Sequence, residues 1–388
     1  MNTKLESLNR KAKIVIAGGG PAGSSAAIRL AMAGFEVSLF ERERFPRHKL
    51  CGEFISPECL GHFRILGVFD EMLSAGGDRI RQTVFYSRNG RSAAVPSRWF
   101  GGDALSLSRS KMDQILLQKA RFLGVNIEEA SSVIGVERSG TGIVGINVRG
   151  PRGTRFIEGD IFIDATGRKA AISRLLDRLE PARHELARPG FVAFKNHLRG
   201  ASIEPGRCEI YFFPGGYGGL SRVENDSANF CFILRSDAAR EYGGGAKNLI
   251  DGLVSLNARA RAKLAGSTPQ GDWLAAAISA FGFKRPCPAA NVFAAGDAGA
   301  FVDPFTGSGM LMALESAGLL AECITTAGGD IAAAAKQYAN IHTEFFTRRL
   351  RICSLLRRAA NASFLHGPAI SMLGLSGYAF SKLARATR

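Results

Sequence analysis

Three glycines near the start of the chain have the spacing of loops that bind the pyrophosphate of a dinucleotide. Gly18, Gly20 and Gly23 follow the apolar run 14–17, and Pro21 lies in the first turn of the helix predicted next. Gly18 permits a tight turn, Gly20 lets phosphates approach the backbone, and Gly23 lets the helix pack closely on the strand. The free N–H groups and the positive end of that helix would then face the phosphates.

A carboxylate follows where such folds bind a ribose. Glu41 ends a second predicted strand, 36–40, at about the 20-residue distance expected after the glycines. An acid there can accept hydrogen bonds from the adenosine ribose hydroxyls, which favours FAD or NAD over NADP. Because strand, loop, helix, second strand and acid occur in order, we expect a dinucleotide site instead of an ordinary glycine turn.

The segment after Glu41 combines a cysteine with several basic residues. Pro46 and Pro57 mark it as irregular. Its basic residues, which gather where phosphates would lie, are Arg42, Arg44, Arg47 and Lys49. The triplet Cys51-Gly52-Glu53 follows them. A solvated loop is the alternative interpretation of this segment.

A second acid lies at a strand end near residue 300. Residues 291–296 have the composition of a buried strand that ends at Asp297, and a Gly/Pro loop then opens a helix predicted over about 308–322. An acid at this point can bind the ribitol hydroxyls of FAD. The positive end of the helix can stabilise negative charge on a reduced flavin.

Together these motifs resemble the geranylgeranyl-reductase-like flavoproteins, within the p-hydroxybenzoate-hydroxylase-type group of FAD-dependent reductases, hydroxylases and halogenases. The resemblance is carried by F-P-R-x-K-x-C-G-E in the basic loop and G-D-A-x-x-x-x-x-P-x-x-G-x-G around Asp297. It implies that Cys51 and Gly52 lie beside the isoalloxazine ring. Arg109, in a segment similar to the family's R-x-x-x-D-x-x-L-x-x-x-A, would reach the FAD, and the backbone near Val133 would flank the adenine.

An inert buried thiol and an ordinary helix-surface arginine are the alternatives for Cys51 and Arg109. The cofactor-binding residues expected from the motifs and the resemblance are Gly18, Gly20, Ala22, Gly23, Glu41, Arg42, Arg47, Cys51, Gly52, Arg109, Val133, Asp297, Pro304, Gly307, Gly309 and Met310. Cys51 and Glu53 are the catalytic candidates, because the resemblance places their loop near the ring. No metal site is expected.

Residues 190–280 are expected to form a substrate roof. The aromatic-rich runs 191–198, 208–213 and 229–234 predict an antiparallel sheet laid over the flavin. The run 211–219 is similar to the family's Y-x-F-P…G-Y-x-W-x-F signature, although Gly219 stands where a tryptophan is usual. The candidate substrate residues in this run are Tyr211, Phe213, Pro214, Gly215, Gly216 and Tyr217. Core packing is the alternative for the aromatic ones.

The predicted fold class is α/β: a Rossmann-like FAD-binding domain with an inserted antiparallel β-sheet substrate domain and C-terminal helices. The expected ranges are 1–80, 103–185 and 283–330 for the FAD-binding domain, 81–102 and 186–282 for the substrate domain, and 331–388 for the helical region. Further expected elements are a helix over 60–73, a hairpin around Asn89-Gly90, a helix opened by Arg109 and a strand over 125–136.

Composition narrows the class of protein. The chain has 388 residues, 46% of them hydrophobic and 22% charged, which is typical of a folded globular protein. Its net charge of +16 comes without a nucleic-acid motif, so we expect a dispersed basic surface, with peripheral membrane contact as the alternative. Seven cysteines without a C-x-x-C pair indicate reduced thiols. With no secretory signal in 1–13, the expected location is the cytoplasm.

The first hypothesis for function is reduction of a carbon–carbon double bond in a hydrophobic, lipid- or prenyl-like substrate by reduced FAD. The second is flavin monooxygenation of a hydrophobic aromatic or polyketide. Halogenation is disfavoured, because the two tryptophans, Trp99 and Trp273, form no W-x-W-x-I-P-like run. A non-catalytic FAD-bound scaffold is the third. Without a second nucleotide-binding motif, NAD(P)H must bind transiently or an electron-donor protein must supply the electrons.

Overall fold

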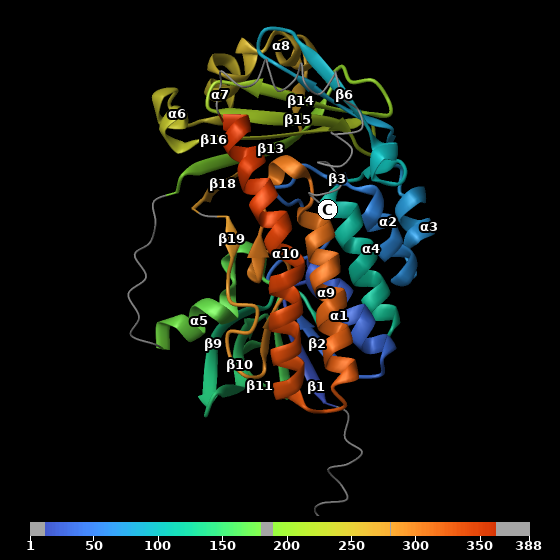
Figure 1. Cartoon of the computed structure of the whole chain (residues 1–388), viewed down its shortest axis with the longest axis vertical. Coiled ribbons are helices and arrows are strands. Elements are labelled where there is room, and N and C mark those ends of the chain that lie inside the picture. The colour runs from blue at the N-terminus through green and yellow to red at the C-terminus, as the bar shows by residue number, and fades with distance from the viewer. Residues whose placement is uncertain (1–11, 180–188, 280, 362–388) are drawn as a thin grey trace, which may run out of the picture.

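A five-stranded parallel sheet forms the base of the computed structural model, which describes residues 12–179, 189–279 and 281–361. Its strands, in spatial order, are β20 (Val292–Ala294), β12 (Ile161–Asp164), β1 (Lys13–Ala17), β2 (Glu36–Phe40) and β8 (Asn126–Glu128). The strands β1, β12 and β20 are almost wholly buried and apolar, as expected for a parallel sheet covered on both faces. This sheet lies in the lower part of Figure 1.

Helices cover one face of the parallel sheet, and a small antiparallel sheet covers the other. The helices in the main core are α1 (Pro21–Met32), α4 (Arg109–Phe122) and α9 (Gly309–Thr326), and α10 (Ile331–Asn361) packs along α9 (Figure 1). The opposite face packs against β9 (Ser132–Ser139), β10 (Gly142–Gly150), β11 (Gly153–Glu158) and α5 (Ala171–Leu179). The chain thereby buries both faces of the strands that carry the glycine loop and Asp297.

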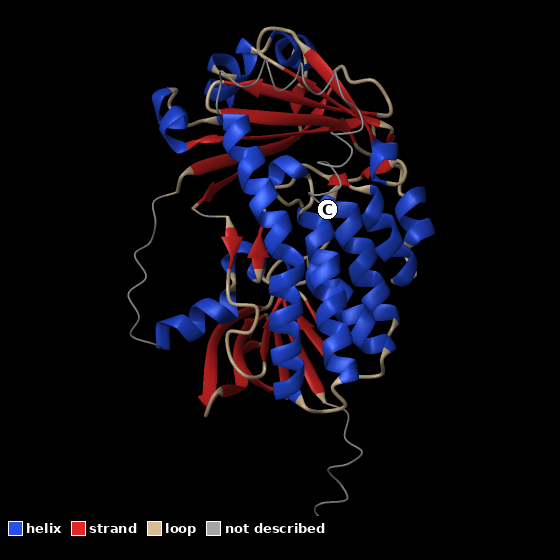
Figure 2. Ribbon diagram, viewed as in Figure 1, coloured by secondary structure: helices blue, strands red, loops and turns tan. Residues whose placement is uncertain are grey.

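A second large sheet closes the top of the molecule (Figure 2). Its strands, in spatial order, are β17 (Thr268–Pro269), β13 (Phe191–Arg199), β16 (Ser227–Arg235), β15 (Gly216–Arg222), β14 (Arg207–Phe213), β5 (Gln82–Tyr86) and β6 (Ser92–Pro96), and β18 (Leu274–Ile278) also pairs with β13. Its outer face packs against short helices: α7 (Ala246–Gly252), η4 (Val254–Leu256) and α8 (Ala258–Leu264), with α6 (Ser236–Glu241) at one end. We call this sheet the roof.

Short elements connect the two halves. They are β3 (Phe54–Ile55), α2 (Pro57–Ile65), α3 (Phe69–Ser74), β4 (Asp78–Ile80), η2 (Ser97–Phe100), β7 (Ala104–Ser106), η3 (Gly167–Lys169), β19 (Gly282–Phe283), η5 (Gly296–Ala298), β21 (Ala300–Phe301) and η6 (Pro304–Thr306). The three strands β3, β7 and β4 form a small antiparallel sheet between base and roof. They position the loop that carries Cys51 under the roof.

Several predicted elements are confirmed, and the mixed α/β class with them. The hairpin of β5 and β6 turns at Gly90, whose φ of 81° favours glycine, and α4 begins at Arg109 with Ser108 as its N-cap. The helix expected over 60–73 is wrong in extent, because Gly67, with a φ of 64°, separates α2 from α3. The strand expected over 125–136 is two strands, β8 and β9, in different sheets.

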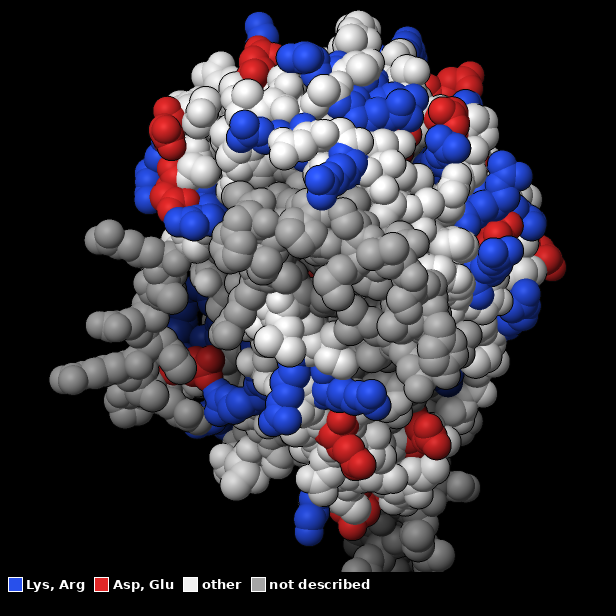
Figure 3. Space-filling model, turned by 45° about the horizontal axis from the view of Figure 1, so that its top comes forward, with Lys and Arg blue, Asp and Glu red and all other residues white. Residues whose placement is uncertain are grey.

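The expected domain ranges stay a prediction, although the sheet pairings follow them. Residues 82 to 96 join the roof through parallel pairing of β5 with β14, far from their neighbours in sequence. In the expected helical region, residues 362–388 lie outside the described residues. On the face shown in Figure 3, Lys and Arg side chains occur over several areas, with Asp and Glu among them. No helix of the described residues is long and apolar enough to cross a membrane.

Candidate active site

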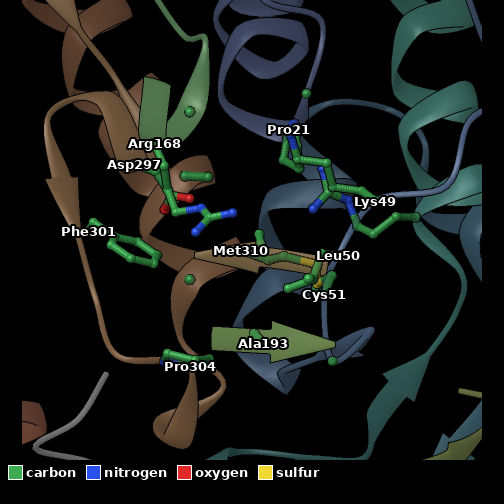
Figure 4. A pocket seen from close by; sticks show the side chains of 18 of the residues that line it. Pro21, Lys49, Leu50, Cys51, Arg168, Ala193, Asp297, Phe301, Pro304 and Met310 are labelled. Carbon is green, nitrogen blue, oxygen red and sulfur yellow. The ribbon is translucent and has the colours of Figure 1, made fainter. Parts of the chain in front are cut away.

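A cavity of about 1160 Å³ lies between the base and the roof. It begins at the glycine loop and the ends of β1, β2 and β12, and it continues beneath β14, β15 and β16. Figure 4 shows Pro21 and Lys49 on one side of it and Asp297 and Arg168 on another, and it also shows Cys51 and Met310 on the cavity wall. Its volume exceeds the roughly 300–1,000 Å³ of single small-molecule sites, so the space suits a large cofactor together with a substrate.

The glycine loop is packed too tightly for side chains. A Cβ at Gly18, where φ is 102°, would lie 2.4 Å from the carbonyl oxygen of Ala165, and one at Gly23 would lie 1.8 Å from that of Gly18. Gly20 is the N-cap of α1, and a Cβ there would meet only the guanidinium groups of Arg109 and Arg47, at 3.7 and 3.9 Å. The backbone of the loop, the positive end of α1 and two guanidinium groups therefore surround the same space, which suits an anion.

Those cations outnumber their carboxylate partners. Arg109 binds Asp113 through two hydrogen bonds of 2.7 Å, and Arg47 Nη1 lies 3.1 Å from the same carboxylate without making a hydrogen bond to any described residue. Burial, followed by the charges of Arg109, Arg47 and Arg42, lowers the pKa of Lys49 to about 8. An anion at this point would relieve the repulsion, as the two phosphates of a dinucleotide would.

Glu41 lies at the cavity wall and is held by backbone donors. Its carboxylate oxygens accept hydrogen bonds from the N–H groups of Gly19, at 2.7 Å, and Glu43, at 2.9 Å. A carboxylate has about four lone-pair positions, so acceptor capacity remains for a ribose hydroxyl. Val133, at the start of β9, and Arg42 line the same end of the cavity.

The opposite end of the nucleotide cradle is formed by the loop before α9. Asp297, half-buried in η5, has a raised pKa because burial outweighs the lowering effect of Arg168 and Lys284. Gly307 has a φ of 64°, a left-handed conformation that would be strained in a residue with a side chain. It precedes α9, which begins at Gly309 and Met310. The N-terminus of an 18-residue helix thus faces the cavity.

These features fit FAD. A tight glycine loop faces excess positive charge, and carboxylates stand at both ends of a cavity that widens under the roof. The expected cofactor residues that line this cavity are Gly18, Gly20, Ala22, Glu41, Arg42, Arg47, Cys51, Gly52, Arg109, Val133, Asp297, Pro304, Gly307, Gly309 and Met310. Gly23 contributes by packing α1 on β1 instead.

Comparison with known proteins decides the family. The model of the FAD binding domain family matches residues 11–327, most of the chain. The chain is a member of this family. It is an FAD-dependent oxidoreductase, as the motifs predicted.

Individual relatives differ in the chemistry their names state. The chain is 27% identical to the menaquinone reductase of Mycolicibacterium smegmatis, over 83% of this chain and 78% of that protein. It is 26% identical to the tryptophan 2-halogenase of Chondromyces crocatus, over 87% of this chain but only 66% of the halogenase. A geranylgeranyl bacteriochlorophyll reductase-like protein from Thermoplasma acidophilum shares the fold, with a TM-score of 0.80, 18% identity and coverage of 97% and 96%.

The roof of this flavoenzyme presents alternate residues of β14 to the cavity. Ile210 and Phe212 line it, whereas Tyr211 and Phe213, expected as substrate residues, point into the core beneath α7 and α8. This follows from the period-2 alternation of side chains along a strand. Tyr211 instead donates a hydrogen bond of 2.7 Å to the buried carboxylate of Glu209.

The other expected substrate residues lie around the β14–β15 turn. Pro214, Gly215 and Gly216 form the turn and the first residue of β15, and they do not line the cavity. Tyr217 does line it, together with Gly219 two positions further along β15. The glycine-rich sequence 215–219 concealed this strand, because glycine is depleted in strands.

The two catalytic candidates have different environments. Cys51 is half-buried at the cavity wall, which Met310 also lines (Figure 4), and its carbonyl accepts a hydrogen bond from Asn229. Glu53 is fully buried, and its carboxylate is bound by the Arg109 N–H, Lys195 and His197. This geometry favours a positioning role for Glu53, while a catalytic role for Cys51 stays a prediction.

Lys49, Arg168 and His48 are among the cavity residues that were not expected as site residues. Lys49 was noted only as part of a basic run, and its position near Arg109 is set by the loop. Arg168 reaches into the cavity from the side of Asp297 (Figure 4), after the turn that follows β12. His48 lines the cavity under the roof. Their only sequence signals were the clustering of charge in 42–49 and the position of Arg168 directly after a strand-end turn.

Proposed function

We propose that this flavoenzyme reduces a carbon–carbon double bond in a hydrophobic, lipid- or prenyl-like substrate. The observation that supports this most is the apolar extension of the cavity beyond Cys51. Its lining there is largely aromatic and aliphatic, and includes Phe85, Val95, Phe100, Ile210, Phe212, Tyr217, Phe232, Phe301 and Phe305. Such a surface favours a long apolar substrate through the hydrophobic effect and offers few groups that would recognise a charged one.

The nucleotide half of the cavity supports a specific placement of FAD. The pyrophosphate would lie against Gly20 and Arg47, the adenosine ribose against Glu41, and the ribitol against Asp297. The flavin ring would then lie between Cys51 and the N-terminus of α9. When bound and reduced, FAD supplies a hydride. The chain itself orients the substrate under the roof and limits the access of water to it.

Reductase relatives support this choice over halogenation. The menaquinone reductase of M. smegmatis is similar over most of both chains. The sequence lacks a W-x-W-x-I-P run, since its two tryptophans, Trp99 and Trp273, are far apart. Monooxygenation of a hydrophobic aromatic or polyketide is the second candidate, since the aromatic lining of the cavity would also accept such a substrate.

For the electron source, we propose NAD(P)H that binds transiently or a separate electron-donor protein. A lipid-like substrate would also require access from a membrane, so we propose peripheral contact of a cytoplasmic protein with the bilayer. The net charge of +16 would favour an anionic lipid surface.

An anaerobic experiment separates reduction from oxygenation. The purified holoprotein is reduced with dithionite under nitrogen and mixed with a geranylgeranyl lipid that has no quinone ring, and flavin absorbance is followed. We expect reoxidation that produces a saturated bond, and none with the fully saturated analogue as the matched control. Hydroxylated product that forms only after oxygen is admitted would instead establish the monooxygenase.

Cys51 is the proposed catalytic group nearest the flavin. We expect Cys51→Ala to keep FAD bound and to lower turnover. The buried Cys59 of α2, replaced by Ala, is the control for loss of a thiol elsewhere. Full activity of Cys51→Ala at unchanged flavin content would leave Cys51 a structural residue.

A further inference from the structure

A buried charged cluster joins the Cys51 loop to the roof. Glu53, which has a left-handed backbone with a φ of 55°, lies 2.7 Å from Lys195 Nζ and 2.6 Å from His197 Nε2. Burial raises the pKa of Glu53, but the hydrogen bond from His197 and the charge of Lys195 outweigh this effect, and the net pKa is lowered. The carboxylate is therefore ionised and can only accept, so His197 must carry its proton on Nε2 and donate it.

His48 contacts this cluster through His197. Its ring lies edge-to-face on the ring of His197, with a centroid distance of 5.1 Å and an interplanar angle of 84°. His197 is held in place by its hydrogen bond to Glu53, so the ring of His48 packs on a side chain with a fixed position. His48 is exposed and lines the cavity, in the same loop as Cys51. One side of the imidazole thus meets the cluster, while another is open to the cavity and to solvent.

We propose that His48 is the proton donor in the reduction of the substrate. This inference rests on the proposed function, because adding hydride to one carbon of a double bond requires a proton at the other. The N–H bond of the His48 imidazolium breaks, a C–H bond forms at the second carbon, and neutral imidazole remains. Water at the exposed side returns the proton, so each cycle consumes one hydride and one proton.

The neighbouring titratable groups are less suited to this role. Glu53 is buried and ionised, so it can only accept hydrogen bonds, and it already accepts from Arg109, Lys195 and His197. Lys49 lies with Arg47 and Arg109 beside the glycine loop, where the phosphates are placed. Asp297 stands at the ribitol end, across the cavity from Lys49 (Figure 4). His48 is the imidazole that the described chain presents to the cavity.

The charges that face His48 make its proton easier to release. Lys195 and His197 face it from β13, Glu53 from its own loop, and Glu224 from the β15–β16 turn. Burial, Lys195 and His197 lower its pKa, and the opposing effect of Glu53 and Glu224 is smaller. The imidazolium form is therefore depleted above pH 6.5. A reaction that uses it should slow as pH rises through the neutral range.

The test compares His48→Gln with wild type in the anaerobic reoxidation assay between pH 5 and 9. We expect wild type to lose rate tenfold per pH unit on the alkaline side. His48→Gln should reoxidise about 10²–10⁴-fold more slowly, a typical effect of removing a general acid, and should lose that pH dependence. His62→Gln is the matched control, because His62 on α2 does not line the cavity. It should keep both the rate and the profile.

Two further measurements separate proton donation from packing. Added imidazole should restore part of the rate to His48→Ala, which it would not do for a merely structural residue. In the oxidised holoprotein, the titration of the His48 ring followed by NMR should show a pKa below 6.5, independently of turnover.

The inference and the proposed function fail in different ways. If wild type reduces the substrate but His48→Gln keeps its rate and pH profile, the proton comes from elsewhere and the inference is overturned. If no prenyl substrate reoxidises wild type without oxygen, the proposed function itself is overturned, and this role of His48 with it.

Discussion

The hydroxyl of Tyr217 donates a hydrogen bond of 3.1 Å to Oδ1 of Asp303, which connects the roof to the loop before α9. The same carboxylate oxygen accepts from the N–H of Phe305, at 2.9 Å, and so caps η6. Since this loop leads to the helix end placed at the flavin, the position of the roof and the shape of the flavin loop are linked through this carboxylate and through Phe305, whose ring packs on those of Tyr217 and Phe212.

Tyr217→Phe tests this connection. We expect it to lower the free energy of unfolding by about 1 kcal/mol, the net contribution of one hydrogen bond, and to raise the KM for substrate while flavin content stays unchanged. Urea denaturation and steady-state kinetics measure these effects. Tyr242→Phe is the control, because the Tyr242 hydroxyl makes no hydrogen bond to a described residue. If Tyr217→Phe behaves like the control, the hydrogen bond does not contribute to the connection, which then rests on the packing of Phe305 against the roof.

Asp297→Ala should weaken FAD retention by roughly 1–3 kcal/mol, the cost of leaving buried partners unpaired. Dialysis against increasing urea or equilibrium titration with FAD measures the change. Asp297→Asn should lose less, because its amide oxygen still accepts a hydrogen bond. Asp272→Ala removes an exposed acid before β18 and should retain FAD fully. Normal flavin occupancy of Asp297→Ala would contradict the placement of the ribitol.

Phe212 and Phe213 are neighbours on β14 with opposite surroundings, so their replacement should have opposite effects. Phe213→Ala is expected to destabilise the protein by about 3–5 kcal/mol, as for a large buried side chain, with Phe213→Leu as the milder variant for kinetics. Phe212→Ala enlarges an existing cavity and should alter the preference among substrates of different chain length. Equal preferences in Phe212→Ala and wild type would show that the substrate does not reach β14.

The sequence was informative where function depends on local spacing. The glycine loop, Glu41 and Asp297 each lie at the end of a buried strand, and strand ends with glycines are recognisable within a short segment. The same locality explains why α4 was predicted from Arg109 onward. The residues lining the nucleotide half of the cavity were therefore largely predictable.

Long-range relationships were not predictable in this way. Glu53 meets Lys195 and His197 across 142 and 144 positions, and nothing in either segment specifies the other. The choice between Phe212 and Phe213 depended on which face of β14 turns to the cavity, and a shift of one residue exchanges the faces. Gly67 ended a helix because of its left-handed backbone, although the apolar spacing on both sides was helical.

His342 on α10 supplies a prediction about pH. Its ring is fully buried among Tyr338, Phe346 and Phe283, and neither ring nitrogen has a hydrogen-bond partner in the described chain. Burial lowers the pKa of His342 to about 4. In the unfolded chain the group titrates near 6.5, so between these values the unfolded state binds more protons than the folded one.

Stability should therefore be fully present above pH 6.5 and should fall as pH decreases toward 4. His342 alone would contribute about 2 kcal/mol to this loss between pH 7.5 and 5. Urea denaturation of the holoprotein at pH 7.5, 6 and 5 measures it. His342→Phe should reduce the loss of stability at low pH. Burial and the charge of Arg29 also lower the pKa of His62 to about 4, so His62→Gln should reduce the loss by a separate amount. Because the two sites share no contact, the double variant should show the sum of both effects. An unchanged pH dependence in His342→Phe would mean that α10 separates from the core before His342 is protonated.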